Sequence, residues 1–183
     1  VVATDRSGDI RYRKLLVATG GIANRLTVPG ADLDGIFCLR TVSDADALKA
    51  AAARAKRAVV VGGSFLGMEV AATLAELGLS VTIIDQEQRL LAKLDAPEVS
   101  AFISDLYTRR NVDIRLSQTV ASFAGENRVR GVATDRGSVI DCDLVVLAVG
   151  VTPAVGFLDG SGIACGDGIL VNQQLQSSDP DIY

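Results

Sequence analysis

The feature that most constrains the fold of this chain is an apolar run at residues 59–61 that passes directly into Gly-Gly-Ser-Phe-Leu-Gly at 62–67. A strand that feeds a tight glycine turn directs the N-terminus of the next helix, with its unpaired backbone N–H groups and positive dipole end, at one point. A second apolar run at 81–84 ends in Asp85, at about the 20-residue offset typical of an acid that binds an adenosine ribose. Together these features predict a strand–turn–helix–strand unit that binds the pyrophosphate of a dinucleotide.

Ser64 departs from the G-x-G-x-x-G pattern, since glycine normally stands at this middle position, against the pyrophosphate. Gly62 permits the turn, and Gly67 allows the helix to pack closely on the strand. The Cβ atom of Ser64 would displace the phosphate unless the hydroxyl donates a hydrogen bond to it. The alternative to a nucleotide site is a plain packing turn of a βαβ unit, but the periodicity and Asp85 both favour the nucleotide site.

The chain has 183 residues, 49% of them apolar and 22% charged, so it can bury one sizeable core or a domain and a half. This composition is typical of a globular protein. The net charge is −4 and the basic residues are scattered, so no basic stripe for a nucleic acid is expected. No apolar stretch reaches membrane-spanning length and no signal peptide is visible, so no membrane partner is expected.

The chain has no histidine, which is the commonest general base and metal ligand. Nucleophilic catalysis of the Ser–His or Cys–His type and a zinc site are therefore excluded within it, and no catalytic side chain is predicted. Its three cysteines, Cys38, Cys142 and Cys165, form no C-x-x-C pair, which is typical of the reducing cytoplasm and predicts no metal centre. Any chemistry must then come from a bound cofactor.

The N-terminal part of the chain has weaker signals. Residues 1–17 are predicted to form a short hairpin with its turn at 7–9, which leads into a buried strand at 14–18. A polar connection follows at 24–35, and then a helix at 43–56, where Ser43 and Asp46 resemble a capping box. The stretches 14–20 and 143–150 share one pattern, an apolar strand that ends in a small residue and glycine. This echo predicts two sheets, the first of them incomplete in this chain.

The middle of the chain alternates between predicted strands and helices. Strands are expected at 58–62, 81–85, 112–115 and 144–149, and helices at 65–77 and 97–109, the second capped by Asp95. Short alternating strands with turn signals at 119–141 predict an antiparallel meander rather than another helix. The predicted fold class is therefore α/β, a Rossmann-like parallel sheet whose last crossover is an antiparallel β-meander.

Several motifs follow one another along the chain in a recognisable order. They are Ala-Thr-Gly at 18–20, the stretches 28–32 and 39–41, the glycine fingerprint at 60–69, Val-Gly-Val-Thr-Pro at 149–153 and Pro-Asp-Ile-Tyr at 180–183. In this order they resemble the FAD-dependent pyridine nucleotide(-disulphide) oxidoreductases. The ferredoxin and rubredoxin reductases of the putidaredoxin reductase and apoptosis-inducing-factor-like type are the most similar. Ala154 departs from the family pattern, where asparagine usually follows the proline.

The resemblance implies a flavoprotein with two dinucleotide-binding domains, in which the NAD domain is inserted into the FAD domain. Residues 1–42 would be the end of the first FAD segment, 43–155 the NAD(H)-binding domain, and 156–183 the start of the second FAD segment. The chain lacks the family's first FAD glycine fingerprint and the Gly-Asp that should follow Tyr183. We therefore expect a piece of the family's protein, with an incomplete flavin site.

The resemblance also assigns residues to the two cofactors. Glu69 would lie beside the nicotinamide, and the alternative is a first-turn carboxylate that only complements the helix dipole. Asp85 would repel the 2′-phosphate of NADPH, so NADH is favoured, although Arg89 lies close enough in sequence to meet that phosphate. FAD would contact Ala18, Thr19, Gly20 and Arg40. NADH would contact Gly62, Gly63, Ser64, Phe65, Leu66, Gly67, Glu69, Asp85, Gln86, Val149, Gly150 and Val151.

In the complete protein, the resemblance implies electron transfer from NADH through FAD to a ferredoxin- or rubredoxin-type acceptor. Whether the protein forms a homodimer stays open. Two alternatives also stay open: a non-catalytic NAD(H)-binding sensor or scaffold, and the flavin portion of a nitrite-reductase-like or NADH-oxidase-like enzyme. A second glycine fingerprint upstream and a Gly-Asp pair downstream in the parent sequence would distinguish a flavoenzyme from the sensor.

Overall fold

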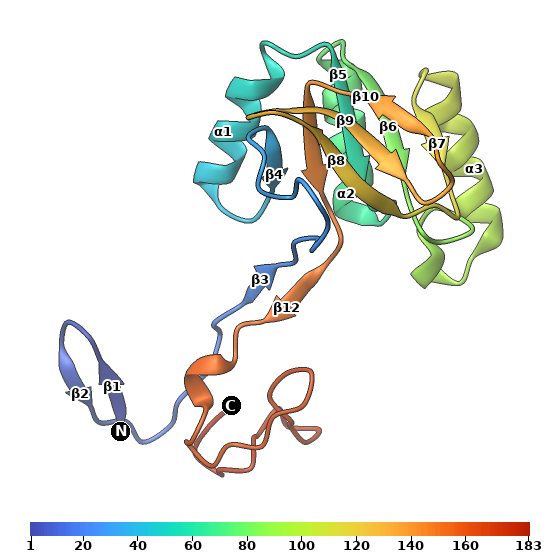
Figure 1. Ribbon diagram of the computed structural model, residues 1–183. Coiled ribbons are helices and arrows are strands. Elements are labelled where there is room, and N and C mark those ends of the chain that lie inside the picture. The colour runs from blue at the N-terminus through green and yellow to red at the C-terminus, as the bar shows by residue number, and fades with distance from the viewer. The chain divides into compact units, whose positions relative to one another are not determined.

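The computed structural model describes residues 1–183, which form two compact units (Figure 1). One unit is Ala23–Gly150, and the other joins Val1–Ile22 with Val151–Tyr183. The first unit begins well before residue 43, where the sequence places the start of the NAD segment, because the strand Ile36–Cys38 belongs to its sheet. This three-residue strand is not predicted from the sequence, in which the region before residue 43 is expected to flank the NAD segment.

A five-stranded parallel sheet forms the centre of the Ala23–Gly150 unit. Its strands lie in the order β4 (Ile36–Cys38), β11 (Leu144–Leu147), β5 (Arg57–Val61), β6 (Ser80–Ile84) and β7 (Asp113–Arg115). Neighbouring strands are parallel throughout, and Val60 pairs with Val146 on one side and Ile83 on the other. The inner strands β5 and β11 are covered on both faces, which explains why their sequences are apolar without interruption.

Helices cover one face of this sheet (Figure 1). They are α1 (Val42–Ala52), α2 (Phe65–Glu76) and α3 (Pro97–Arg109). Leu48 of α1 and Leu74 of α2 belong to the same buried cluster as Val60 of the sheet. The Tyr107 hydroxyl of α3 donates a 2.8 Å hydrogen bond to the main-chain oxygen of Met68 in α2. None of the helices is long and apolar enough to cross a membrane.

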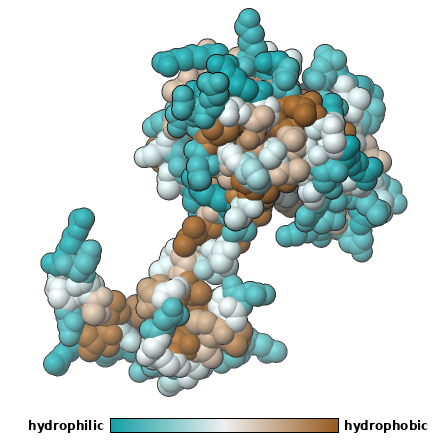
Figure 2. All heavy atoms as spheres, in the orientation of Figure 1, coloured by the Kyte–Doolittle hydropathy of each residue, from teal (hydrophilic) through white to brown (hydrophobic).

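The other face of the sheet carries the predicted meander. Strands β8 (Val120–Gly125), β9 (Val129–Thr134) and β10 (Val139–Asp141) form an antiparallel sheet in the order β10-β9-β8. Phe123 and Val132 pack there against Val59 of β5. Val59 therefore faces the meander and Val60 the helices, as the two-residue period of a strand requires. Hydrophilic and apolar residues are mixed on the exposed side of the unit (Figure 2).

The Val1–Ile22 and Val151–Tyr183 unit contains little regular structure. Strands β1 (Val2–Thr4) and β2 (Gly8–Ile10) form a hairpin, and β3 (Gly21–Ala23) pairs with β12 (Val151–Pro153). The hairpin is predicted correctly, but its turn lies at 5–7 rather than 7–9. Ser7 donates its backbone N–H to the hydroxyl of Thr4, which in turn donates to the carbonyl of Gly8.

The predicted buried strand at 14–18 is wrong. Leu15 forms only an isolated parallel bridge with Ile182, and the side chain of Leu16 is 72% exposed. The predicted first sheet is thus reduced to this bridge. A short apolar run becomes a buried strand only where neighbouring strands cover it, and its sequence does not contain that information.

Two predicted helix caps also differ from the structure. The N-cap of α1 is Thr41, whose hydroxyl accepts from the N–H of Asp44, and the Asp44 carboxylate accepts from the N–H of Thr41. These bonds hold the pKa of Asp44 below its ordinary value. The capping box therefore lies two residues before the predicted one, and α1 ends at Ala52 rather than 56.

Helix α3 has the predicted bounds but not the predicted cap. Its N-cap is Ala96, because Asp95 closes the short helix η1 (Ala92–Leu94) in a left-handed conformation with φ 49°. The Asp95 carboxylate lies 3.0 Å from the guanidinium of Arg89. A second short helix, η2, spans Gly156–Leu158.

Asp143 connects the meander to the parallel sheet at the start of β11. Its carboxylate accepts 2.9 Å hydrogen bonds from the backbone N–H groups of Lys56 and Arg57, where β5 begins. The bond from Lys56 is the largest of the effects that lower the pKa of Asp143. Because the pKa is lowered in the folded state, the stabilisation is present above the ordinary pKa near 3.8 and is lost as the pH falls through the folded-state pKa.

We therefore expect Asp143→Asn to lower the free energy of unfolding at pH 7 by roughly 1–2 kcal/mol, since the charge-assisted bonds are weakened. The difference from wild type should shrink below about pH 4. Urea unfolding at pH 7 and pH 3 measures both effects. Asp141→Asn is the matched control, because the Asp141 side chain is 71% exposed and its ion pair with Arg57 should contribute less than about 0.5 kcal/mol. Equal losses for the two variants would contradict this account.

Candidate dinucleotide-binding site

A cleft of about 410 Å³ opens at the carboxyl ends of β5, β6 and β11. Ligands bind at this edge of open parallel α/β sheets, because loops and helix N-termini meet there. This main cleft is bounded by the glycine turn after β5, the loop after β6, the loop after β7 and the end of β11. Its lining residues are Leu26, Val61, Gly62, Gly63, Ser64, Phe65, Ile84, Asp85, Gln86, Glu87, Leu91, Ala92, Lys93, Leu94, Gln118, Thr119, Val120, Ala148, Val149 and Gly150.

The glycine turn packs too closely for side chains at two positions. Gly62 has φ +111°, and a Cβ atom there would overlap the carbonyl group of Ala148, the residue just after β11. A Cβ atom on Gly67 would overlap the carbonyl oxygen of Gly62. The roles that the sequence predicts for these two glycines, a turn and a close approach of helix to strand, therefore have a direct steric cause.

The carboxylate of Asp85 holds this turn in place. One of its oxygens accepts a short hydrogen bond from the backbone N–H of Gly63, and the other accepts a 2.9 Å bond from the N–H of Glu87. A Cβ atom on Gly63 would lie 2.5 Å from Cδ2 of Leu90 and 2.8 Å from the first oxygen of Asp85, so Gly63 leaves room for both side chains. The carboxylate is thereby fixed in the lining of the cleft, with lone pairs left for further donors.

Ser64 is the N-cap residue of α2, and its hydroxyl makes no capping hydrogen bond. Its φ of −87° is accessible to any residue, so the backbone does not need glycine here. The side chain is exposed and lines the main cleft, next to the free N–H groups of the first helical turn. An anion in the cleft would meet both the helix N-terminus and an unengaged hydroxyl donor.

The charged lining of the cleft is Asp85, Glu87 and Lys93. Arg89, which the sequence offers as a partner for a 2′-phosphate, does not line the cleft and instead pairs with Asp95 at 3.0 Å. The cleft therefore carries two acids and one lysine, with an acid directly at the glycine turn.

The structure brings together many of the residues assigned to NADH. Gly62, Gly63, Ser64, Phe65, Asp85, Gln86, Val149 and Gly150 line the main cleft, and Gly67 is buried beneath the turn. Leu66 and Glu69 instead line a second, apolar groove of about 470 Å³ between α1 and α2. Glu69 lies beyond the first turn of α2, so its interpretation as a dipole-complementing carboxylate is wrong. Val151 lies in the other unit, in β12.

The residues assigned to FAD are divided between the two units. Ala18, Thr19 and Gly20 belong to the Val1–Ile22 segment, and the Thr19 hydroxyl donates a 2.9 Å bond to the carbonyl of Ala154. Arg40 lies just before α1 in the Ala23–Gly150 unit, and its backbone N–H donates to Asp44.

Sequence reasoning missed several lining residues, above all Lys93, Gln118 and Thr119. A signal for the last two exists, because they follow the third parallel strand and the carboxyl ends of parallel strands share one edge. The thiol of Cys142 is not part of the site. It is fully buried beside the meander, and burial raises its pKa to about 12.

Comparison with protein families matches residues 1–183 to the description "Pyridine nucleotide-disulphide oxidoreductase". The chain belongs to this family. It is 37% identical to the ferredoxin reductase subunit of 5,5'-dehydrodivanillate O-demethylase from Sphingobium sp., over 100% of this chain and 45% of that protein. Among solved structures, a ferredoxin reductase from Rhodopseudomonas palustris superposes with a TM-score of 0.92 at 36% identity, over 97% of this chain and 44% of that one.

Putidaredoxin reductase in its covalent complex with putidaredoxin is a further structural relative. It has a TM-score of 0.89 and 33% identity over 96% of this chain and 44% of that one. The chain thus spans less than half the length of these family members.

In this family member we expect Ser64→Gly to weaken NADH binding by roughly 1–1.5 kcal/mol, because the free hydroxyl is placed to donate to a charged phosphate oxygen. Ser64→Ala keeps the Cβ atom, removes the hydroxyl and should lose a similar amount. Titration calorimetry measures the affinities, and urea unfolding checks that stability is unchanged. Tighter binding by Ser64→Gly would instead show that the Cβ atom obstructs the phosphate.

NADH is expected to bind at least about tenfold more tightly than NADPH, because a 2′-phosphate would face the fixed carboxylate of Asp85. Gln86→Arg should narrow this preference, since it adds a guanidinium in the cleft and keeps the Asp85 bonds. Arg89→Gln is the matched control and should leave the preference unchanged, because Arg89 is directed at Asp95. Titrations of each variant with both nucleotides give the ratios, and equal wild-type affinities would show that Asp85 does not discriminate.

Proposed function

We propose that this chain is the NADH-binding part of an FAD-dependent oxidoreductase that passes electrons from NADH through FAD to a ferredoxin- or rubredoxin-type protein. The observation that carries the proposal is the glycine turn locked by Asp85 at the N-terminus of α2, inside the main cleft. The ferredoxin reductases among the relatives support the rest of the assignment. The activity, the cofactor FAD and the acceptor are proposed for the complete protein.

The residues of the cleft fit NADH along its length. The pyrophosphate would lie against Ser64 and the N-terminus of α2, where backbone N–H groups and the free hydroxyl can donate hydrogen bonds to an anion. The adenosine ribose would donate to the carboxylate of Asp85. Val149 and Gly150, at the end of β11, would border the nicotinamide end. Bound FAD would accept the hydride and release single electrons, and the protein would supply orientation.

We further propose that the complete protein has the predicted order of a first FAD segment, the NAD domain and a second FAD segment. The NAD domain would start before β4 (Ile36–Cys38) rather than at residue 43, because β4 belongs to the same sheet as the strand before the glycine turn. Ala18, Thr19, Gly20 and Arg40 would contact FAD in the complete protein. The free cysteines Cys38, Cys142 and Cys165 support a cytoplasmic protein. A homodimer would appear as a doubled mass in light scattering.

The proposal is tested first at the nucleotide. We expect the 183-residue chain to bind one NADH and, since the residues assigned to FAD are divided between the two units, to carry no flavin absorbance. Gly62→Ala should abolish NADH binding, because its Cβ atom overlaps the Ala148 carbonyl and displaces the turn. Calorimetry measures binding, and circular dichroism checks the fold.

The matched control is Gly78→Ala. Gly78 also has a positive φ, +88°, but a Cβ atom there meets nothing within 4 Å, and it lies beyond the far end of α2. The control should bear similar backbone strain and bind NADH as wild type does. A folded wild-type chain that binds no NADH, or a folded Gly62→Ala that binds it normally, would overturn the proposal. A yellow chain that reduces ferricyanide with NADH would overturn the assignment of the flanking segments.

A further inference from the structure

Gln118 presents an unpaired polar group at the main cleft. Its side chain lines the cleft, yet its Oε1 atom is buried and accepts no hydrogen bond from any protein donor. A buried carbonyl oxygen without a donor is destabilising, so such an atom in a native fold calls for a physical explanation. The terminal torsion of glutamine is soft, so a small rotation of the carboxamide directs its oxygen and nitrogen along the cleft wall.

The backbone around Gln118 is rigidly tied to the Asp85 loop. The N–H of Gln118 donates a 3.0 Å bond to the main-chain oxygen of Asp85, and the N–H of Ser117 donates a 2.9 Å bond to that of Glu87. Ser117 itself is in the left-handed conformation, with φ 54°. The carboxamide is therefore held beside the residue that would bind the adenosine ribose.

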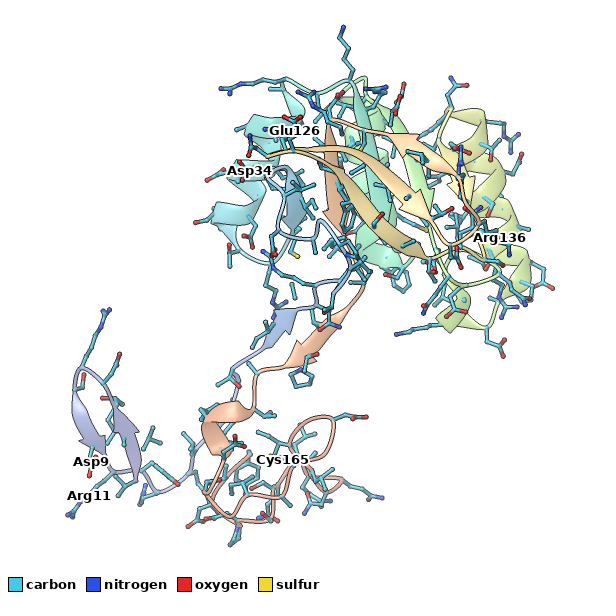
Figure 3. The ribbon with its side chains drawn as sticks, in the orientation of Figure 1. Asp9, Arg11, Asp34, Glu126, Arg136 and Cys165 are labelled. Atoms are coloured by element: carbon cyan, nitrogen blue, oxygen red, sulfur yellow. The ribbon has the colours of Figure 1, made fainter.

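The β9–β10 turn anchors the same loop from the other side. Arg136, at that turn (Figure 3), donates from Nε to the carbonyl of Ser117 at 2.9 Å. The Asp135 carboxylate accepts a 2.9 Å bond from the N–H of Thr119, which lowers the pKa of Asp135 below its ordinary value. Both neighbours of Gln118 are thus fixed by side chains of the meander, while its own carboxamide oxygen has no partner.

We propose that Gln118 reads the base of the dinucleotide, with its carboxamide accepting from the 6-amino group of adenine. The inference rests on the proposed nucleotide function and adds a specificity-determining residue to it. The base is attached to the ribose that Asp85 would hold, so it lies next to the Gln118 loop. Glutamine matches adenine because it can accept from the 6-amino group and donate to N7, whereas hypoxanthine presents acceptors at both position 6 and N7.

The test compares NADH with reduced nicotinamide hypoxanthine dinucleotide, whose base has a carbonyl in place of the 6-amino group and a proton on N1. Calorimetry on the 183-residue chain should show NADH binding roughly three- to tenfold more tightly, as one discriminating hydrogen bond provides. Gln118→Leu should bring the ratio of the two affinities close to one. Gln118→Glu keeps the acceptor and should retain the preference for adenine.

Gln88→Leu is the matched control, since Gln88 is exposed on the neighbouring loop and does not line the cleft. It should leave the ratio as in wild type. A wild-type ratio near one, or an unchanged ratio in a folded Gln118→Leu, would overturn the role of Gln118 while NADH binding itself persists. Failure of both dinucleotides to bind the wild-type chain would instead overturn the proposed function.

Discussion

Asp85 makes the interactions on which the rest of the site depends. Its carboxylate joins the glycine turn to the loop after β6, through the N–H groups of Gly63 and Glu87. Its backbone N–H donates to Arg115 of β7, and its carbonyl accepts from Gln118. One residue thus connects the loops that follow three parallel strands. Glycine turns are conformationally permissive. This turn is held in one conformation because the Asp85 carboxylate binds the N–H of Gly63 in the turn and the N–H of Glu87 in the next loop.

The parts of the fold that the sequence predicts are those in which local pattern and packing agree. Strands β5 and β11 are apolar throughout because both their faces are covered, and helix α2 begins where a glycine turn ends. The meander can be predicted from the sequence because buried and exposed residues alternate along parts of its strands. Prediction fails where burial depends on residues distant in the sequence. Strand β4 has only three residues and is not predicted. The run at 14–18 is predicted as a buried strand, but no neighbouring strands cover it.

The site residues also fall into two groups, those predictable from local sequence and those that depend on tertiary structure. The residues of the glycine turn and Asp85 are predictable, because they belong to a motif whose spacing reflects one βαβ unit. Gln118 and Lys93 could not be assigned in this way, because their positions depend on how the meander and the η1 helix close over the sheet edge. The sequence offers Arg89 as a partner for a 2′-phosphate for a related reason. Its pairing with Asp95 depends on the left-handed conformation of Asp95, which the sequence does not reveal.

The two ends of the cleft differ in how many hydrogen bonds order their residues before a ligand binds, and this difference affects the free energy of binding. At the end formed by Asp85 and Gln118, hydrogen bonds fix the loops that would meet the adenosine. They join these loops to one another, to β7 and to side chains of the β9–β10 turn. At the start of α2, the hydroxyl of Ser64 is free of any capping bond and must be ordered by its ligand. Ordering a side chain on binding costs free energy, whereas a preorganised loop has already lost that freedom on folding. We therefore expect selectivity to be strongest at the adenosine end, where a mismatched group would meet the fixed carboxylate of Asp85 and a Gln118 loop whose backbone is already ordered.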